Sequence, residues 1–191
     1  MTASYFDRGL GEFLDLVAKR RPEPGGGAVA GVTVSLAASL VAMAARHSAD
    51  RLDGGGRLVD DAERLRVRAA GLADDDAEAY GAVIAAYAAA RDDDSLDRQE
   101  VRRALMRAAE VPLEIAEVGA ETARLAALLA AEGKRDVRGD ATTALLLAEA
   151  ATRSAAHLVA VNVDAAGGDQ ELVRRATDSV ATARDAAAVV E

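Results

Sequence analysis

The sequence predicts an all-α protein, a helical bundle of about six helices with long helices at its centre. Hydrophobic residues make up 51% of the 191 positions, but aromatic residues account for only 3%. The core must therefore consist of alanine, leucine and valine, and such small side chains favour close helix packing over a sheet. Long segments also repeat apolar residues every three or four positions, the period of one helix face. Because no internal repeat or linker divides the chain, we expect a single domain over residues 1–191.

Charge and composition argue against several classes of function. The net charge of −9 argues against a nucleic-acid partner, which needs a basic face, and against a membrane surface as the main partner. The chain has no cysteine and only two histidines, so thiolate chemistry is excluded and a histidine-rich metal site is not expected. Acidic residues at positions 7 and 12 and the lack of a signal-peptide pattern lead us to expect a cytoplasmic protein.

The first predicted element is an amphipathic helix over residues 4–20, with Ser4 at its N-cap and the acidic Asp7 in its first turn. Pro22 and Pro24 then end this helix. Its apolar residues recur at helical spacing and form one face, made of Phe6, Leu10, Phe13, Leu14 and Val17.

A run of one proline and three glycines, Pro24-Gly25-Gly26-Gly27, precedes an uncharged helix predicted over residues 28–45. Two interpretations stay open: the run offers the positive end of that helix to an anion, or it is a flexible turn into a tightly packed core helix. The missing Gly-Lys-Ser/Thr sequence argues against a P-loop. The helix is long enough to span a membrane, but its small residues insert weakly, so we expect it to be buried in protein.

The next predicted helix, over residues 57–90, carries a carboxylate on its apolar face. Apolar residues step by threes and fours along this helix, and the step after Leu72 falls on Asp76. Asp74 and Glu78 point to the opposite side. A lone carboxylate on a buried face costs several kcal/mol unless it is paired or neutralised, so Asp76 requires an explanation.

The acidic cluster around Asp76 allows three interpretations. Asp74, Asp75 and Glu78 fit a solvated run of charges. The same oxygens could bind a metal, but no Glu-x-x-His motif supports a di-iron bundle. The third interpretation is a buried acid at Asp76, whose pKa is raised by desolvation and which suits proton transfer or balances a substrate cation.

A long helix predicted over residues 96–131 contains Pro112. A proline removes one backbone hydrogen bond and should kink or split the helix near residues 110–111. The apolar spacing continues on both sides, so we expect either two collinear helices or one bent helix.

Asp140 stands where the N-cap of the next helix belongs, ahead of residues 141–163. That helix has few charged groups, so we expect it to be buried on nearly all sides, at the centre of the bundle or against a second subunit. A final amphipathic helix is predicted from Asp169 to the C-terminus.

Several of these motifs occur together in one order. They are Pro24-Gly25-Gly26-Gly27 before a small-residue helix, the acidic stretch 72–80, Glu-Val-Pro-Leu at 110–113, Gly139-Asp140, and Asn162. In this combination the chain resembles the cyclodeaminase/cyclohydrolase family. That family comprises the C-terminal domain of formiminotransferase-cyclodeaminase and the stand-alone methenyltetrahydrofolate cyclohydrolases. The resemblance covers almost the whole chain and thins after Gly167.

The resemblance implies an all-helical domain that forms a homodimer, with a folate cleft at or near the dimer interface. It implies one of two activities: loss of ammonia from 5-formiminotetrahydrofolate to give the 5,10-methenyl compound, or hydrolysis of the methenyl compound to 10-formyltetrahydrofolate. The substrate would be a tetrahydrofolate derivative, and no metal or other cofactor is required. The alternative is a non-catalytic domain that binds folate, or a scaffold that has kept the dimer fold.

The resemblance also implies which residues form the site. Catalysis falls to the second aspartate of the Asp-x-Asp-Ala motif, Asp76, with Asp74 as the next candidate. Three positions depart from the family pattern, because Ala28, Leu158 and Gly139 stand where relatives carry polar side chains. The residues implied in substrate binding are Pro24, Gly25, Gly26, Gly27, Asp140 and Asn162.

Overall fold

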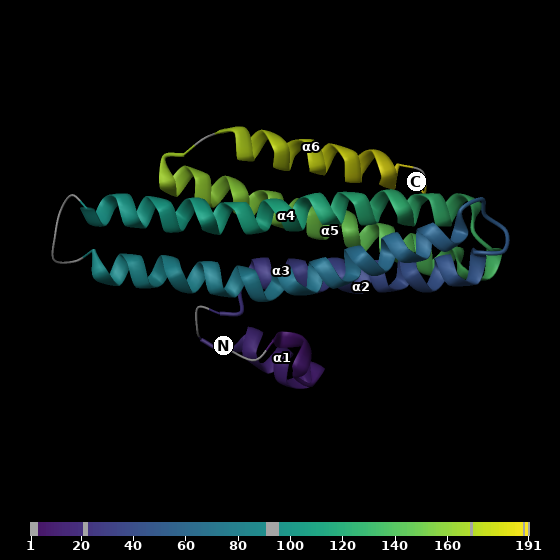
Figure 1. Cartoon of the computed structure of the whole chain (residues 1–191), viewed down its shortest axis with the longest axis horizontal. Coiled ribbons are helices and arrows are strands. Elements are labelled where there is room, and N and C mark those ends of the chain that lie inside the picture. Colours follow the sequence, from purple (N-terminus) through teal and green to yellow (C-terminus); the bar gives the residue numbers. More distant parts are fainter. Residues whose placement is uncertain (1–3, 21–22, 91–95, 169, 189, 191) are drawn as a thin grey trace.

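A computed structural model describes residues 4–20, 23–90, 96–168, 170–188 and 190, which form an up-and-down bundle of helices (Figure 1). The predicted all-α fold is confirmed, since the described residues contain six α-helices and two short 3-10 helices. The elements are η1 (Tyr5–Asp7), α1 (Leu10–Ala18), α2 (Gly26–Ser48), α3 (Gly55–Ala89), α4 (Leu96–Glu132), η2 (Arg135–Val137), α5 (Arg138–Ala166) and α6 (Gln170–Ala187).

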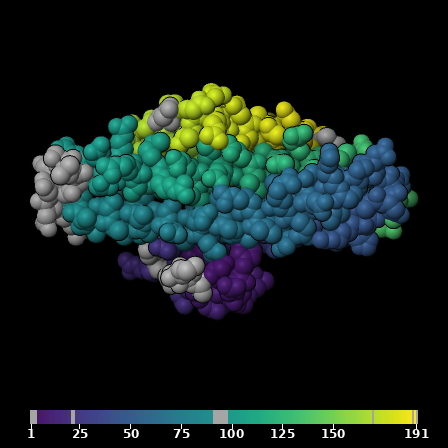
Figure 2. Space-filling view, in the orientation of Figure 1, coloured from purple at the N-terminus to yellow at the C-terminus, as the bar shows by residue number. Residues whose placement is uncertain are grey.

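Four long helices, α2 to α5, form the body of the bundle. Helix α2 packs against α3 and α5, and α4 packs against α3, α5 and α6. In Figure 1, α6 lies along the upper side of the bundle, whereas α1 lies below the pair formed by α2 and α3. Figure 2 shows the face formed by α3 and α4, with α6 and α1 at opposite edges. The first helix therefore lies outside the four-helix body.

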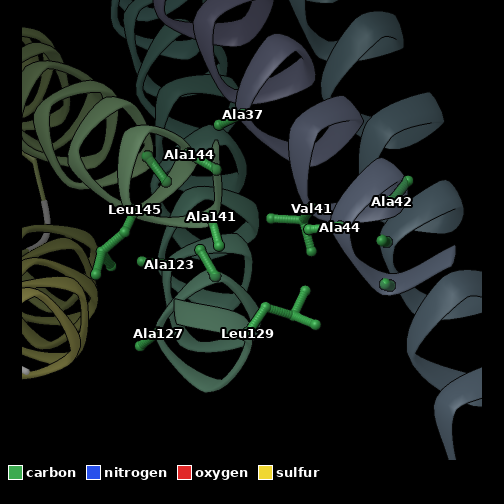
Figure 3. Packing of buried hydrophobic residues seen from close by; sticks show 14 of the residues in the cluster. Ala37, Val41, Ala42, Ala44, Ala123, Ala127, Leu129, Ala141, Ala144 and Leu145 are labelled. Atoms are coloured by element: carbon green, nitrogen blue, oxygen red, sulfur yellow. The ribbon is translucent and has the colours of Figure 1, made fainter. Parts of the chain in front are cut away.

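The core is built largely from alanine, as the composition predicted. In the largest cluster, buried alanines of α2, α4 and α5 surround a few larger side chains such as Val41 and Leu129 (Figure 3). One close contact between helices involves Gly119 of α4, where an added Cβ would overlap Thr152 Oγ1 of α5. Thr152 is fully buried and its hydroxyl donates a 2.8 Å hydrogen bond to the carbonyl of Ala148, so it has little room to withdraw.

Pro112 does not interrupt α4. The helix runs continuously from Leu96 to Glu132, with the proline in its interior. Of the two predicted alternatives, two collinear helices are therefore wrong, and residues 110–111 belong to one helix.

The N-terminal segment departs from the prediction of one helix over residues 4–20. It forms η1 and α1, because Arg8 and Gly9 adopt extended backbone conformations between them. Ser4 acts as an N-cap, since its hydroxyl accepts a hydrogen bond from the Phe6 N–H at 3.1 Å. Phe13 of the predicted apolar face is buried, but the other members are exposed, namely Phe6, Leu10, Leu14 and Val17.

The start of α5 corrects a second prediction. The helix begins at Arg138, with Val137 at its N-cap and no side-chain hydrogen bond there. Because η2 leads directly into α5, the helix starts earlier than predicted, and Asp140 lies in its first turn rather than at the N-cap. The prediction of Asp140 as the N-cap was therefore wrong.

Two apolar stretches, Gly26–Ser48 and Arg135–Ala166, are long and apolar enough to cross a membrane by length and composition alone. In the bundle, 61% of the most apolar window of Gly26–Ser48 is buried, which is the packing expected of a core helix. The share for the second stretch is 39%, so much of the apolar surface of α5 stays exposed.

We expect Gly119→Ala to destabilise the fold, because the new methyl group would overlap Thr152 Oγ1. Overpacking of this kind costs about 1–3 kcal/mol, which exceeds the roughly 1 kcal/mol gained when alanine replaces glycine in a helix. In a Thr152→Ala background the same substitution should no longer destabilise. Urea unfolding followed by circular dichroism measures the free energy of unfolding of each variant.

Gly71→Ala is the matched control for this experiment. Gly71 is an exposed residue of α3, and nothing lies within 4 Å of an added Cβ. This substitution should stabilise the chain by up to about 1 kcal/mol. If Gly119→Ala were as stable as Gly71→Ala, α4 and α5 would not be in close contact at Gly119.

Candidate functional site

A cavity of ≈ 280 Å³ opens between the start of α2 and helices α3, α4 and α5. Its volume lies just below the range for small-molecule sites, about 300–1,000 Å³. Each of the four long helices contributes to its wall. The residues that matter for its chemistry are Glu23 and Gly25–Gly27 at the start of α2, Asp76 and Tyr80 of α3, Ala108 and Pro112 of α4, and Leu158, Val161 and Asn162 of α5.

Asp76 lies on the face of α3 that the helical period predicted, and its carboxylate packs against the first turn of α2. A Cβ added to Gly27 would overlap both carboxylate oxygens of Asp76, so a side chain at this position would displace the carboxylate. The backbone N–H of Ala28, in the same turn, donates a hydrogen bond to the carboxylate. The glycine run thus brings Asp76 itself to the positive end of α2.

Burial raises the pKa of Asp76 from its ordinary value of 3.8 to about 6. Loss of solvent around the ionised carboxylate is the main cause, and the hydrogen bond from Ala28 acts in the opposite direction. The negative charge of Glu23 raises the pKa further. A carboxyl group with a pKa near 6 changes its protonation state close to neutral pH, which suits it to general acid–base catalysis.

The charged side chains in the cavity wall are acidic. Glu23 and Asp76 contribute carboxylates, and no described residue that lines the cavity is a lysine, arginine or histidine. Asp76 is therefore not the buried partner of an arginine, which a purely structural role would favour. Leu158, Val161 and Pro112 supply apolar surface beside the two carboxylates. Such a cavity suits a ligand that combines positive charge with apolar area.

Asn162 of α5 and Pro112 of α4 both line the cavity. Asn162 Nδ2 donates a 2.6 Å hydrogen bond to the backbone carbonyl of Ala108. In an uninterrupted helix residue 112 would bond this carbonyl, but a proline has no N–H to donate. Through this hydrogen bond α5 satisfies the acceptor that Pro112 leaves without a helical donor.

Asp74 faces the N-terminal segment rather than the cavity. Its Oδ2 accepts a 2.6 Å hydrogen bond from Ser4 Oγ, and its Oδ1 accepts a 2.8 Å hydrogen bond from the backbone N–H of Tyr5. Asp74 does not line the cavity that contains Asp76. The structure therefore gives Asp74 the position of a residue that connects η1 to α3.

The other residues implied in the site are divided between the cavity and its surroundings. Gly25 to Gly27 and Asn162 line the cavity. Pro24, the residue before Gly25, is buried. Asp140 is exposed in the first turn of α5, 22 residues before Asn162, or about 33 Å along a helix that rises 1.5 Å per residue. One chain thus brings Asp76 and Asn162 together with the glycine run, but not with Asp140.

Glu23 is a site residue that the sequence motifs did not indicate. It stands in a Pro-Glu-Pro segment directly ahead of the glycine run and outside any helix, so no helical period assigns it to a face. Its position in the chain was the available signal, because an acid so close to the glycine run must lie wherever that run lies. Tyr80, the last residue of the acidic stretch 72–80, and Leu158, a departure from the family pattern, also line the cavity.

Comparisons with known proteins show which family this chain resembles in sequence and in fold. The family model for formiminotransferase-cyclodeaminase matches residues 9–182. A methenyltetrahydrofolate cyclohydrolase from Methylorubrum extorquens is 33% identical over 159 residues, which cover 78% of this chain and 76% of the relative. The crystal structure of formiminotetrahydrofolate cyclodeaminase from Thermotoga maritima matches with a TM-score of 0.83 and 27% identity, over 96% of this chain and 93% of that chain. The chain therefore belongs to the formiminotransferase-cyclodeaminase family, as its motifs predicted.

Proposed function

We propose that this chain is a tetrahydrofolate one-carbon enzyme, a methenyltetrahydrofolate cyclohydrolase that forms 10-formyltetrahydrofolate. The observation that carries the proposal is the largely buried carboxylate of Asp76, set in a cavity whose charged lining residues are acidic. The methenyl group is a cation, so this cavity attracts it and places an ionisable carboxylate beside the one-carbon bridge. The relative that is 33% identical is a methenyltetrahydrofolate cyclohydrolase.

In this mechanism Asp76 acts first as a base and then as an acid. Its carboxylate takes a proton from water as the water oxygen bonds to the methenyl carbon, which gives a neutral tetrahedral adduct. The protonated Asp76 then gives that proton to N5 of the folate as the bond from the one-carbon unit to N5 breaks. The hydroxyl of the adduct loses its proton to solvent as the formyl group forms. The methenyl cation and one water become 10-formyltetrahydrofolate and one proton, and Asp76 is restored.

Formiminotetrahydrofolate cyclodeaminase is the second candidate, favoured by the match to a cyclodeaminase structure over 96% of this chain. In that reaction N10 of the folate attacks the carbon of the protonated formimino group, and Asp76 takes the proton of N10. Asp76 then gives the proton to the departing ammonia, which leaves the 5,10-methenyl cation. Both conversions are redox-neutral, so neither requires a redox cofactor.

We also propose that the chain is a homodimer whose interface covers the outer faces of α2 and α5. These neighbouring helices expose large apolar side chains: Leu36 is 56% exposed, Leu146 is 50% exposed and Val161 is 49% exposed. Val161 also lines the cavity, so a second copy on this surface would extend the cavity wall. This arrangement matches the expectation of a folate cleft near a dimer interface.

We expect Asp76→Asn to lower kcat/KM for methenyltetrahydrofolate by about 10²–10⁴-fold, the usual contribution of general acid–base catalysis. The amide keeps the shape of the side chain but cannot accept the proton. The loss of absorbance of the methenyl compound measures the rate. The control is Asp75→Asn, which changes the residue before Asp76, on the flank of α3, and should retain the wild-type rate. If the wild-type chain accelerated neither folate reaction, the proposed function would be wrong; an unimpaired Asp76→Asn would remove only the role of Asp76.

The pH profile is a second readout of this role. Asp76 has to be ionised to accept a proton, and its pKa is about 6, so kcat/KM should fall as the pH decreases from about 7 to about 5. Glu23 and Tyr80 also face the cavity, so the matched comparison is the residual activity of Asp76→Asn. That residual activity should lack the midpoint near pH 6. A wild-type rate that stayed constant over this range would contradict the assignment.

Gly27→Ala should lower kcat/KM about as much as Asp76→Asn, because the new Cβ would occupy the place of the Asp76 carboxylate. Gly26→Ala is the matched comparison, since its Cβ would meet only Leu158 Cδ1 at 3.8 Å, an ordinary contact, and it should lose far less activity. Circular dichroism confirms that both variants fold before the folate assay. Equal rates for the two variants would show that Gly27 is not needed to accommodate Asp76.

Leu36→Glu should shift the homodimer toward the monomer, because it places a charge on the proposed apolar interface. Val67→Glu is the control, since Val67 is 60% exposed on α3, outside that interface. Sedimentation equilibrium measures both masses. A monomeric wild type would contradict the homodimer, and a dimer that Leu36→Glu left intact would place the interface on another surface.

A further inference from the structure

The backbone carbonyl of Ala108 is the acceptor that the sequence of α4 leaves without a partner. In an α-helix this carbonyl bonds the N–H four residues later, which here belongs to Pro112 and does not exist. Ala108 is 5% exposed, and a buried carbonyl without a donor costs free energy. Asn162 Nδ2 supplies the donor from α5 at 2.6 Å.

The same hydrogen bond fixes the orientation of the Asn162 side chain. Its amide carries donors on nitrogen and an acceptor on oxygen. Because a carbonyl can only accept, Nδ2 has to face Ala108, and Oδ1 is left on the other side of the amide. Asn162 lines the cavity from an otherwise apolar stretch of α5 that includes Leu158 and Val161. The wall therefore presents an acceptor at this point.

We propose that Pro112 is a positioning residue of the substrate site. Because Pro112 has no N–H to donate to the Ala108 carbonyl, Asn162 Nδ2 bonds this carbonyl instead. Asn162 Oδ1 then stays available to an N–H donor of the ligand. The identity of that ligand rests on the proposed function, since the ring of a reduced folate carries N–H groups. Asn162 Oδ1 adds a neutral acceptor to the carboxylates of Glu23 and Asp76 in the cavity wall. The site thus takes a ring that combines N–H donors with positive charge.

A first test requires no folate. Asn162 is the only asparagine of the chain, so labelling the asparagine side chain with ¹⁵N gives a single NH₂ signal pair by NMR. In Pro112→Ala the N–H gained at position 112 competes for the Ala108 carbonyl. Exchange of the Asn162 amide protons with solvent should then accelerate on the order of tenfold, the loss of one hydrogen bond. An unchanged exchange rate and chemical shift would overturn the proposal, whether or not the chain catalyses a reaction of folates.

A second test separates the positioning role from a structural one. Alanine is favoured over proline in a helix interior, so Pro112→Ala should raise the urea midpoint of unfolding. The same variant should raise KM for methenyltetrahydrofolate on the order of tenfold, with a smaller change in kcat because Asp76 is not altered. Higher stability with an unchanged KM would overturn the proposal.

The Asn162→Ala background supplies the control for lost cavity contacts. If Pro112 acts through Asn162, Pro112→Ala should have no further effect on KM when Asn162 is already alanine. An equal increase of KM in both backgrounds would mean that Pro112 contacts the substrate directly and would overturn the positioning role. If the wild type turned over neither folate, the proposed function would fail, and the NMR signal of Asn162 would still decide the role of Pro112.

Discussion

The architecture depends on the close approach of α2 and α3 at Gly27 and Asp76. One turn further along α2, a Cβ added to Gly31 would lie 3.1 Å from the backbone of Ala73, so the two helices touch along a whole turn. Because Gly27 leaves the volume of a side chain empty, the Asp76 carboxylate fills it. The N-terminus of α2 then supplies the N–H that a largely buried carboxylate needs. One contact between two helices therefore serves both the packing and the chemistry of the site.

The fold opposes the ionised form of Asp76. The pKa in the folded chain, about 6, lies above the ordinary value of 3.8, so the folded chain binds the proton more tightly than the unfolded chain. The contribution of this group to stability is therefore largest below pH 3.8 and is lost as the pH rises through about 6. At neutral pH no basic residue among those described in the cavity wall balances the Asp76 carboxylate, and a cationic substrate would supply the counter-charge. Reactive groups at active sites commonly lower the stability of the free protein in this way.

The fold class, the long helices and the position of Asp76 could be predicted from the sequence, because they depend on composition and local period. Stepping from Leu72 to Asp76 requires no knowledge of the neighbouring helices. What the sequence did not indicate depends on tertiary contacts: Glu23 lies in a non-helical turn, and the partner of the Pro112 region comes from α5. The pattern around Leu14 showed that a helix face is apolar but not which surface, if any, covers it.

The hydrogen bonds of Asp74 have a consequence for the chain ahead of α2. Among the described residues of this N-terminal arm, Ser4 and Tyr5 bond to Asp74, and the glycine run at the other end lies against Asp76. Both ends of this N-terminal arm thus contact a single turn of α3, and α1 lies between them in the sequence. The entropy of closing a loop grows slowly, by about 0.6 kcal/mol for each doubling of its length. During evolution the arm can therefore gain or lose residues around α1 while the Asp76 carboxylate keeps its place.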